Sequence, residues 1–231
     1  MEILVKKKCR LQHSIFIIAL FGFITTACGN ADRFESLILS GQMSELTDDG
    51  SFFPSGTLNG ILTSPVGGEG TITNGQMNFT IGIPDTSLLQ SVNEFFHAIF
   101  DPEGYNYTNI TFSVPEAKVI SFSELNGETE NGDAFIVQRV GSNYNDGLLE
   151  TVSYVFADRD LTITAQGRSG EEDHIIAFSD IELQLQQGWN VLYHKVNFFE
   201  FPFLITIEVI NRDGFPYNEL IWTNSAGTVM R

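Results

Sequence analysis

Cysteine is nearly absent from this chain, which has only Cys9 and Cys28 among its 231 residues. Cys9 lies in an N-terminal segment with the composition of an export signal, so only Cys28 remains once such a signal is removed. A single cysteine cannot form an internal disulfide or a zinc site built from several thiolates. The sequence therefore excludes a disulfide-stabilised fold and predicts that Cys28 serves as an attachment point.

Basic residues are also few: 12 Lys and Arg stand against 29 Asp and Glu, and the formal net charge is −17. Removing residues 1–27 takes away four of the basic residues and one of the acidic ones, which leaves a formal charge of −20. Nucleic-acid phosphates require clustered Lys and Arg, so we expect no nucleic-acid partner. High negative charge mainly keeps a protein soluble, and cation binding is the alternative.

Familiar catalytic motifs are missing as well. Gly167, Ser169 and Gly170 do not have the Gly-x-Ser-x-Gly spacing of a nucleophile elbow, and no phosphate- or dinucleotide-binding glycine loop occurs. The histidines after residue 27 are not spaced as zinc ligands, and His194 is expected at the surface of a predicted strand. No local pattern selects two of the many carboxylates as a glycosidase pair. The sequence therefore predicts no catalytic residue and no cofactor.

The N-terminus has the three parts of an export signal. A basic stretch ending at Arg10 is followed by an apolar run from Ile15 to Ile24, shorter than the roughly 20 residues of a transmembrane helix. The next residues, Thr26-Ala27-Cys28, resemble the lipobox of bacterial lipoproteins, although Thr25 stands where Leu, Val or Ile is usual. The alternative is an ordinary signal peptide that is cut near Ala27.

The lipobox resemblance implies a signal peptide over residues 1–27 and a membrane anchor at Cys28. In that family the cysteine sulfur carries a diacylglycerol, and the new amine carries an acyl chain, typically palmitate. Two or more acyl chains make a stable anchor, at about 0.8 kcal/mol per buried CH₂ group. Gly29 rather than Asp follows Cys28, which in two-membrane bacteria is usual for lipoproteins of the outer membrane, facing either the periplasm or the exterior.

Residues 28–55 have the acidic, Gly and Ser composition of a lipidated tether, in which residues 34–39 are predicted as a short helix. From residue 56 to 231 the pattern predicts a mainly β fold, an antiparallel β-sandwich of one domain or two small modules divided near 125–133. Asn74-Gly75 has the composition of a tight hairpin turn. Strands are expected at 57–63, 70–73, 76–83, 108–114, 118–122, 134–141, 150–157, 161–166, 175–178, 181–186, 189–196, 204–210 and 219–222.

One segment, residues 87–100, has a helical period instead. Its apolar residues are spaced to form one face, which we expect to pack on a sheet. Ser87 and Gln90 have the spacing of a capping box, and Asp101-Pro102 is expected to end the helix.

The most distinctive motifs lie in the C-terminal part. Asp158-Arg159-Asp160 and Gly188-Trp189-Asn190, followed by Trp222, resemble segments of uncharacterised secreted or lipid-anchored bacterial β-proteins. This resemblance implies a fold class but no activity. From the residues themselves, we interpret the first motif as a charged turn and the second as a turn that places an aromatic ring at the start of a strand.

An acidic turn offers the one candidate metal site. Glu128, Glu130 and Asp133 alternate as calcium ligands do, but the segment lacks the Gly and Glu positions of an EF-hand loop. A solvated hairpin turn is the favoured interpretation.

The sequence is compatible with three functions. The first is a non-catalytic lipoprotein whose β domain binds an envelope protein or has a structural role. The second is a glycan-binding module that uses exposed aromatic residues, with Trp189 and Trp222 as ligand-facing candidates beside Tyr105 and Tyr107. The third, a hydrolase with an acid pair, is the least favoured.

Overall fold

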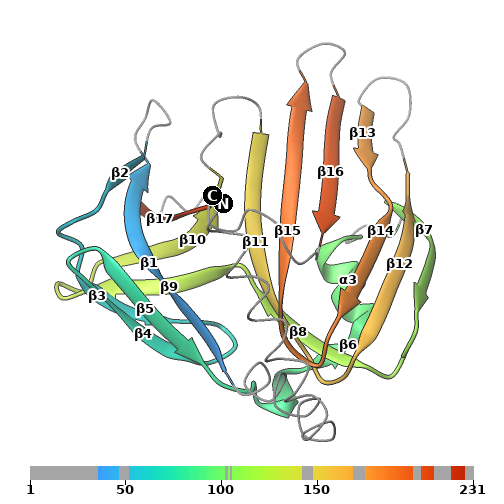
Figure 1. The fold of residues 1–231 in the computed structure, drawn as a ribbon, viewed down its shortest axis with the longest axis horizontal. Helices are drawn as coiled ribbons and strands as arrows, with labels where there is room; N and C mark the ends of the chain where they lie inside the picture. Colours follow the sequence, from blue (N-terminus) through green and yellow to red (C-terminus); the bar gives the residue numbers. More distant parts are fainter. Residues whose placement is uncertain are drawn as a thin grey trace, which may run out of the picture.

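The computed structural model describes residues 36–46, 52–101, 104, 106–141, 148–168, 175–199, 204–210 and 220–226. Within these ranges the chain forms seventeen strands and one α-helix, so the predicted mainly β fold is confirmed (Figure 1). None of the helices described is long and apolar enough to cross a membrane.

Seven strands pair into a barrel-like ring in the order β1-β5-β4-β3-β9-β10-β17, with β17 returning to β1. The β1–β17 pair is parallel and joins the two ends of the chain, whereas the other six pairs are antiparallel. The strand β2 (Phe52–Pro54) adds to β1. The ring strands are β1 (Leu37–Leu46), β3 (Gly60–Thr63), β4 (Glu69–Thr73), β5 (Gln76–Ile81), β9 (Glu124–Thr129), β10 (Ala134–Val140) and β17 (Ile221–Ala226).

The interior of the ring is filled by alternate residues of its strands. On β5, Met77, Phe79 and Ile81 are buried while the residues between them are exposed, as the period of a half-buried strand requires. The hairpin of β4 and β5 turns at Asn74-Gly75, where both residues have the positive φ angles that were predicted from this pair.

The rest of the chain continues this sheet and adds a second, smaller one. A single register pair, Val140↔Thr151, joins β10 to β11, and β11 pairs with both β8 and β15. The second sheet has the order β14-β12-β7. These strands are β6 (Gln90–Ser91), β7 (Tyr107–Phe112), β8 (Lys118–Phe122), β11 (Leu148–Ala157), β12 (Leu161–Gly167), β13 (Ile175–Phe178), β14 (Ile181–Leu185), β15 (Gly188–Phe199) and β16 (Leu204–Ile210).

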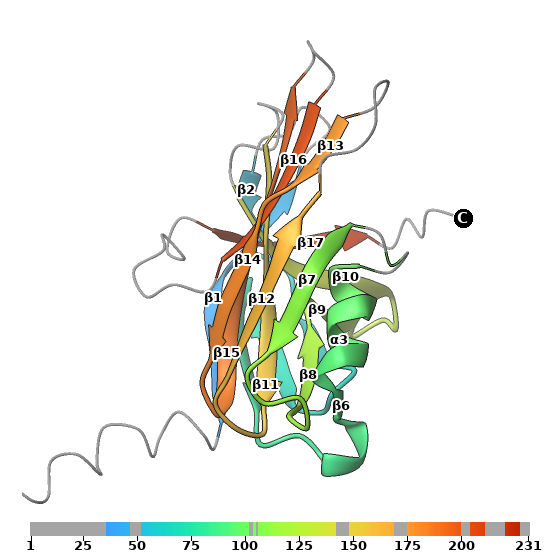
Figure 2. The same ribbon diagram turned by 90° about the vertical axis from the view of Figure 1, so that its right-hand side faces the viewer.

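The strand β11 separates two hydrophobic cores. Val152 and Tyr154 belong to the core of the ring, while Val155 and Ala157 belong to a second core. This second core also contains residues of β12, β14 and the helix α3 (Val92–Ile99), three elements that are labelled in Figure 2. The two cores therefore meet at a common wall. Residues 125–133, where the sequence left a subdivision open, lie in the β9–β10 hairpin, whose two strands are neighbours in the ring.

The predicted tether is partly wrong. Residues 37–46 and 52–54 of the expected 28–55 tether are strands of the main sheet, and residues 37–39 of the expected short helix lie in β1. Leu39 and Met43 point into the core on alternate positions of β1. The Ser, Gly and Gln residues between them gave the segment the composition of a tether, although it is half-buried.

The helix predicted at 87–100 is shorter than expected. The helix α3 covers Val92–Ile99, after a 3₁₀ turn η1 (Thr86–Leu88) and the short strand β6. The capping box uses Ser91 and Glu94 instead of Ser87 and Gln90, because the helix begins only after β6 has paired with β8.

Replacing Ser91 with Ala is expected to lower the free energy of unfolding by about 1 kcal/mol, because the first turn of α3 loses the hydroxyl that accepts a hydrogen bond from the Glu94 N–H. Urea unfolding followed by circular dichroism measures this. The matched variant Ser87→Ala should change stability less, and an equal loss in both variants would contradict the assignment of the cap.

Candidate functional site

Trp222, a predicted ligand-facing aromatic, lies inside the ring on β17 and is only 5% exposed. Its ring stacks on Tyr154 with centroids 6.4 Å apart, and the Arg139 guanidinium lies 5.5 Å from the ring centre. A Cβ atom at Gly41 would come within 2.6 Å of Trp222 Cδ1, so Gly41 leaves room for the indole. Burial raises the pKa of Tyr154 to about 12, although the charge of Arg139 acts in the opposite direction. Trp222 is therefore a core residue.

Trp189, the second predicted aromatic, is half-buried at the start of β15. Its Nε1 donates a hydrogen bond to the Gly82 carbonyl at 3.1 Å, and its ring packs edge-to-face against Phe122 and Phe156. Tyr107 is buried in the second core, and Tyr105 lies outside the described residues. The two tryptophans thus do not form an exposed pair, and Trp189 mainly ties β15 to the segment after β5.

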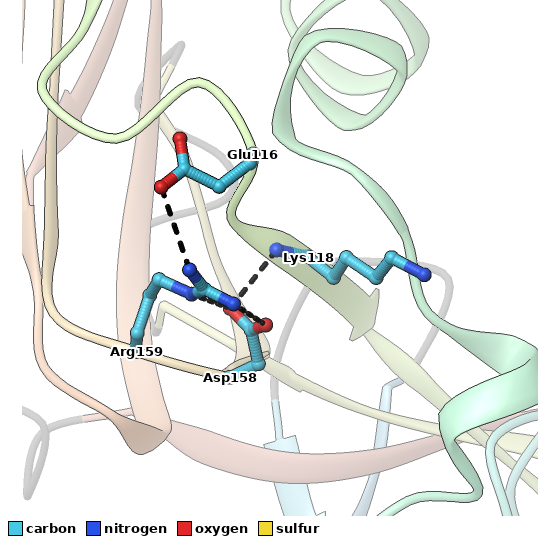
Figure 3. Close-up of polar contacts among 4 residues, drawn as sticks. All are labelled: Glu116, Lys118, Asp158 and Arg159. Atoms are coloured by element: carbon cyan, nitrogen blue, oxygen red, sulfur yellow. Dashed lines mark hydrogen bonds and ion pairs between the residues drawn. The ribbon is translucent and has the colours of Figure 1, made fainter.

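The charged motif Asp158-Arg159-Asp160 is the turn between β11 and β12, as its sequence predicted. Figure 3 shows the contacts of its first two residues. Asp158 accepts a hydrogen bond from the Lys118 backbone N–H at 3.0 Å and two from Arg159, at 3.1 and 3.0 Å. Arg159 Nη1 also lies 3.5 Å from Glu116. Partial burial acts to raise the pKa of Asp158, but the hydrogen bonds from Arg159 and from Lys118 outweigh it and hold that pKa below its usual value.

The neighbouring motif residues also hold turns in place. Asp160 accepts a hydrogen bond from the Gln187 N–H at 2.7 Å, which connects the β11–β12 turn to the β14–β15 turn. Asn190 accepts one from the Gln186 N–H at 2.9 Å and donates to the carbonyls of Gln186 and Gly188. These side chains satisfy backbone groups that a tight turn leaves unpaired. Asp158, Asp160 and Asn190 of the distinctive C-terminal motifs therefore stabilise turns.

Of the candidate calcium ligands, Glu128 is exposed near the end of β9, and Glu130 and Asp133 lie on the exposed β9–β10 turn. Hydrogen bonds that involve Thr129 hold this turn: its N–H donates to the Asp133 carbonyl at 2.9 Å, and its hydroxyl accepts from the Asp133 N–H at 3.1 Å. Across the described residues, no three His, Cys, Asp or Glu side chains gather as metal ligands. The hydrogen bonds of the hairpin are therefore sufficient to explain the conformation of this turn.

One pair of side chains was not predicted from the sequence: Ser153 on β11 and His194 on β15, whose residue types often act together in catalysis. Their side chains meet at 2.7 Å between Ser153 Oγ and His194 Nε2. His194 was expected at the surface, but it is half-buried and stacks on Phe100 at 6.3 Å. Only the pairing of β11 with β15 brings the two residues together, so no local motif signals them.

A serine nucleophile needs a base that accepts its proton near neutral pH, and His194 is a weak one. Burial lowers the pKa of His194 to about 4. The buried carboxylate of Asp101, which follows Phe100 in the sequence, accepts a hydrogen bond from the Asn106 N–H at 2.7 Å and lies 3.8 Å from His97 Nδ1. The geometry of Ser153 and His194 therefore suits a structural hydrogen bond better than nucleophilic catalysis.

The lowered pKa of His194 predicts a pH-dependent stability. The unfolded chain takes up a proton near pH 6.5 while the folded chain resists it down to about pH 4, so stability should fall as the pH drops through this window. Relative to the wild type, His194→Asn should flatten the fall in the urea midpoint between pH 6.5 and 4. Equal slopes in the wild type and in His194→Asn would contradict the prediction.

Cys28, the predicted lipidation site, lies outside the described residues. No protein-family model matches the chain, and neither the curated proteins nor the solved structures provide a match. The function must therefore be argued from the chain's own residues.

Proposed function

We propose that this chain is a membrane-anchored lipoprotein of the cell envelope, whose β body has a non-catalytic binding or structural role. The observation that carries the proposal is Thr26-Ala27-Cys28 at the end of a basic and then apolar N-terminal segment. Cys28 is also the only cysteine after that segment. The lipid is a diacylglycerol on the Cys28 sulfur with an acyl chain on its amine, and Gly29 favours the outer membrane of a two-membrane bacterium.

The position of β1 supports a body held close to the membrane. Only eight residues, 29–36, separate Cys28 from Leu37, where β1 begins. At about 3.3–3.6 Å per residue, this chain spans at most roughly 30 Å. The body is therefore held near the bilayer by a link much shorter than the sequence pattern alone suggested.

A non-catalytic role is supported by what the candidate side chains do. Trp222 fills the ring, Asp158 and Asn190 hold turns, and His194 is a poor base next to Ser153. Each of these groups thus has a role in the fold. For the second part of the chain we propose a sandwich-like arrangement, in which the β14-β12-β7 sheet faces β11 and β15 across the second core.

Metabolic labelling with an alkyne-bearing palmitate tests the anchor. The wild type and the control Cys9→Ala should incorporate the label, because Cys9 lies in the segment that is removed. Cys28→Ala should incorporate none. An unlabelled wild type, or a labelled Cys28→Ala variant, would overturn the proposal.

Glycan binding is the alternative, and one observation favours it. The outer face of β7 and β12 carries polar uncharged side chains in hydrogen-bonded pairs, with Asn109 donating to Gln166 and Thr111 lying 2.6 Å from Thr164 between hydroxyl oxygens. Hydroxyl and amide groups in a row can bond to sugar hydroxyls. Retention on immobilised envelope polysaccharide that is lost in Gln166→Ala and Thr111→Val would support this alternative, and no retention of the wild type would remove it.

A further inference from the structure

Three exposed apolar residues lie on segments at the same end of the molecule. Ile38, Ile83 and Leu88 are 69%, 60% and 45% exposed, and they are half of the large hydrophobic residues that are exposed in the described part of the chain. Leu37 pairs with Ile81, so the beginning of β1 lies beside the end of β5, and Ile83 and Leu88 follow that end in the sequence. Figures 1 and 2 both show these segments at the lower end of the molecule.

Hydrogen bonds hold this apolar end in a fixed shape. Trp189 Nε1 binds the Gly82 carbonyl next to Ile83, and the Asp85 carboxylate accepts a hydrogen bond from the Ser87 N–H at the start of η1, which carries Leu88. The half-buried Trp189 thus lies against the backbone just before Ile83. The three side chains are therefore presented to solvent by ordered backbone rather than by a loose end.

The same end is where the chain arrives from Cys28. The eight residues between Cys28 and Leu37 bring this end within roughly 30 Å of the anchor at most. The opposite end, marked by β2 and the exposed Phe53, lies beyond the ten residues of β1, a further rise of about 33 Å. The lower end is thus the one that a lipid on Cys28 would bring to the bilayer.

We propose that Ile38, Ile83 and Leu88 form a membrane-docking end that inserts into the lipid surface beside the acylated Cys28. This inference rests on the proposed function, because it uses the anchor to choose the lipid bilayer as the occupant. The contact with lipid is apolar and not electrostatic. The chain carries a strong negative charge and Asp85 lies between Ile83 and Leu88, so this end has no attraction to anionic headgroups. Anionic lipids should therefore not strengthen it, and added salt should not weaken it.

Fluorescent labels on introduced cysteines test the proposal in the full lipidated protein. The Cys28 sulfur is in a thioether after lipidation, so Ile83→Cys, Leu88→Cys and the matched control Phe53→Cys each provide one free thiol. The labelled proteins are reconstituted into phosphatidylcholine vesicles that contain a nitroxide lipid. We expect loss of fluorescence at positions 83 and 88, while the label at 53 keeps its intensity.

Vesicle flotation separates the two proposals. Protein that floats with the vesicles but shows equal fluorescence at positions 53, 83 and 88 would overturn the docking end and leave the anchor standing. Protein that does not float would overturn both. Labels at 83 and 88 that quench one another between copies, without quenching from the lipid, would show that a second copy covers this end and would also overturn the proposal.

Discussion

Replacing Cys28 with Ala is expected to move the mature protein from the membrane fraction to the soluble fraction of the envelope. The change removes the sulfur that carries the diacylglycerol, and acyl chains supply about 0.8 kcal/mol of membrane affinity per buried CH₂ group. A body with few basic residues has no electrostatic attraction to anionic lipid that would replace this anchor. Fractionation followed by N-terminal sequencing of the cleaved form measures the effect.

The controls for this experiment come from the chain itself. Cys9→Ala should remain in the membrane fraction, because that residue is discarded with the signal. The circular dichroism spectrum and the urea midpoint of mature Cys28→Ala should match those of the wild type, since Cys28 precedes β1 by nine residues. A cleaved Cys28→Ala protein that still carries a lipid would contradict lipid attachment at this residue.

Replacing Trp222 with Ala is expected to lower the free energy of unfolding by about 3–5 kcal/mol. The indole is buried in the ring, stacks on Tyr154 and lies under the Arg139 guanidinium, so its removal leaves a cavity and takes away both contacts. Trp222 also lies where the parallel β1–β17 pair closes the ring, at the register pair Met43↔Trp222. The loss should therefore weaken the closure as well as the core.

Two comparison variants separate the role of the indole from a general surface effect. Trp222→Phe keeps an aromatic ring and should cost less than Trp222→Ala. Phe53 on β2 is largely exposed, so the free energy of unfolding of Phe53→Ala should stay within about 0.5 kcal/mol of the wild-type value. A Trp222→Ala protein as stable as Phe53→Ala in urea would show that Trp222 is not a core residue.

Local patterns in the sequence predicted the hairpins and faces of the fold well. Asn74-Gly75 signals its turn through residues that tolerate positive φ, and Leu161, Ile163 and Ala165 on β12 are buried on one face as their alternation indicates. Alternation identifies the buried face of a strand but not its partner. The closure of the ring by β1 and β17, from opposite ends of the chain, therefore has no local signal.

The segment that was wrongly predicted as a tether also depends on a partner strand that its own sequence does not reveal. Leu37–Leu46 contains Gly41 and polar residues that are typical of a linker, yet Leu39 and Met43 are buried. Gly41 is required because the Trp222 ring occupies the space of a side chain there. That reason depends on a residue 181 positions away, so only the folded chain reveals it.

The candidate site residues were harder to predict than the strands. Composition alone could not decide whether Trp189 and Trp222 face a ligand or the core, because an aromatic residue on a strand suits either role. The burial of Trp222 and the hydrogen bond from Trp189 to the Gly82 carbonyl show that both residues pack within the fold. Conversely, Ile83 and Leu88 follow a strand as ordinary apolar residues, and only their exposure next to the start of β1 suggests a membrane contact.

The mass of the N-terminal peptide of the mature protein tests the central claim most directly. Digestion of the protein purified from membranes, followed by mass spectrometry, should show a peptide that begins at Cys28 and carries a diacylglycerol and an amide-linked acyl chain. Such a peptide would establish both the cleavage after Ala27 and the lipid attachment. A peptide that begins at Cys28 with a free thiol, or an uncut signal segment, would contradict the account.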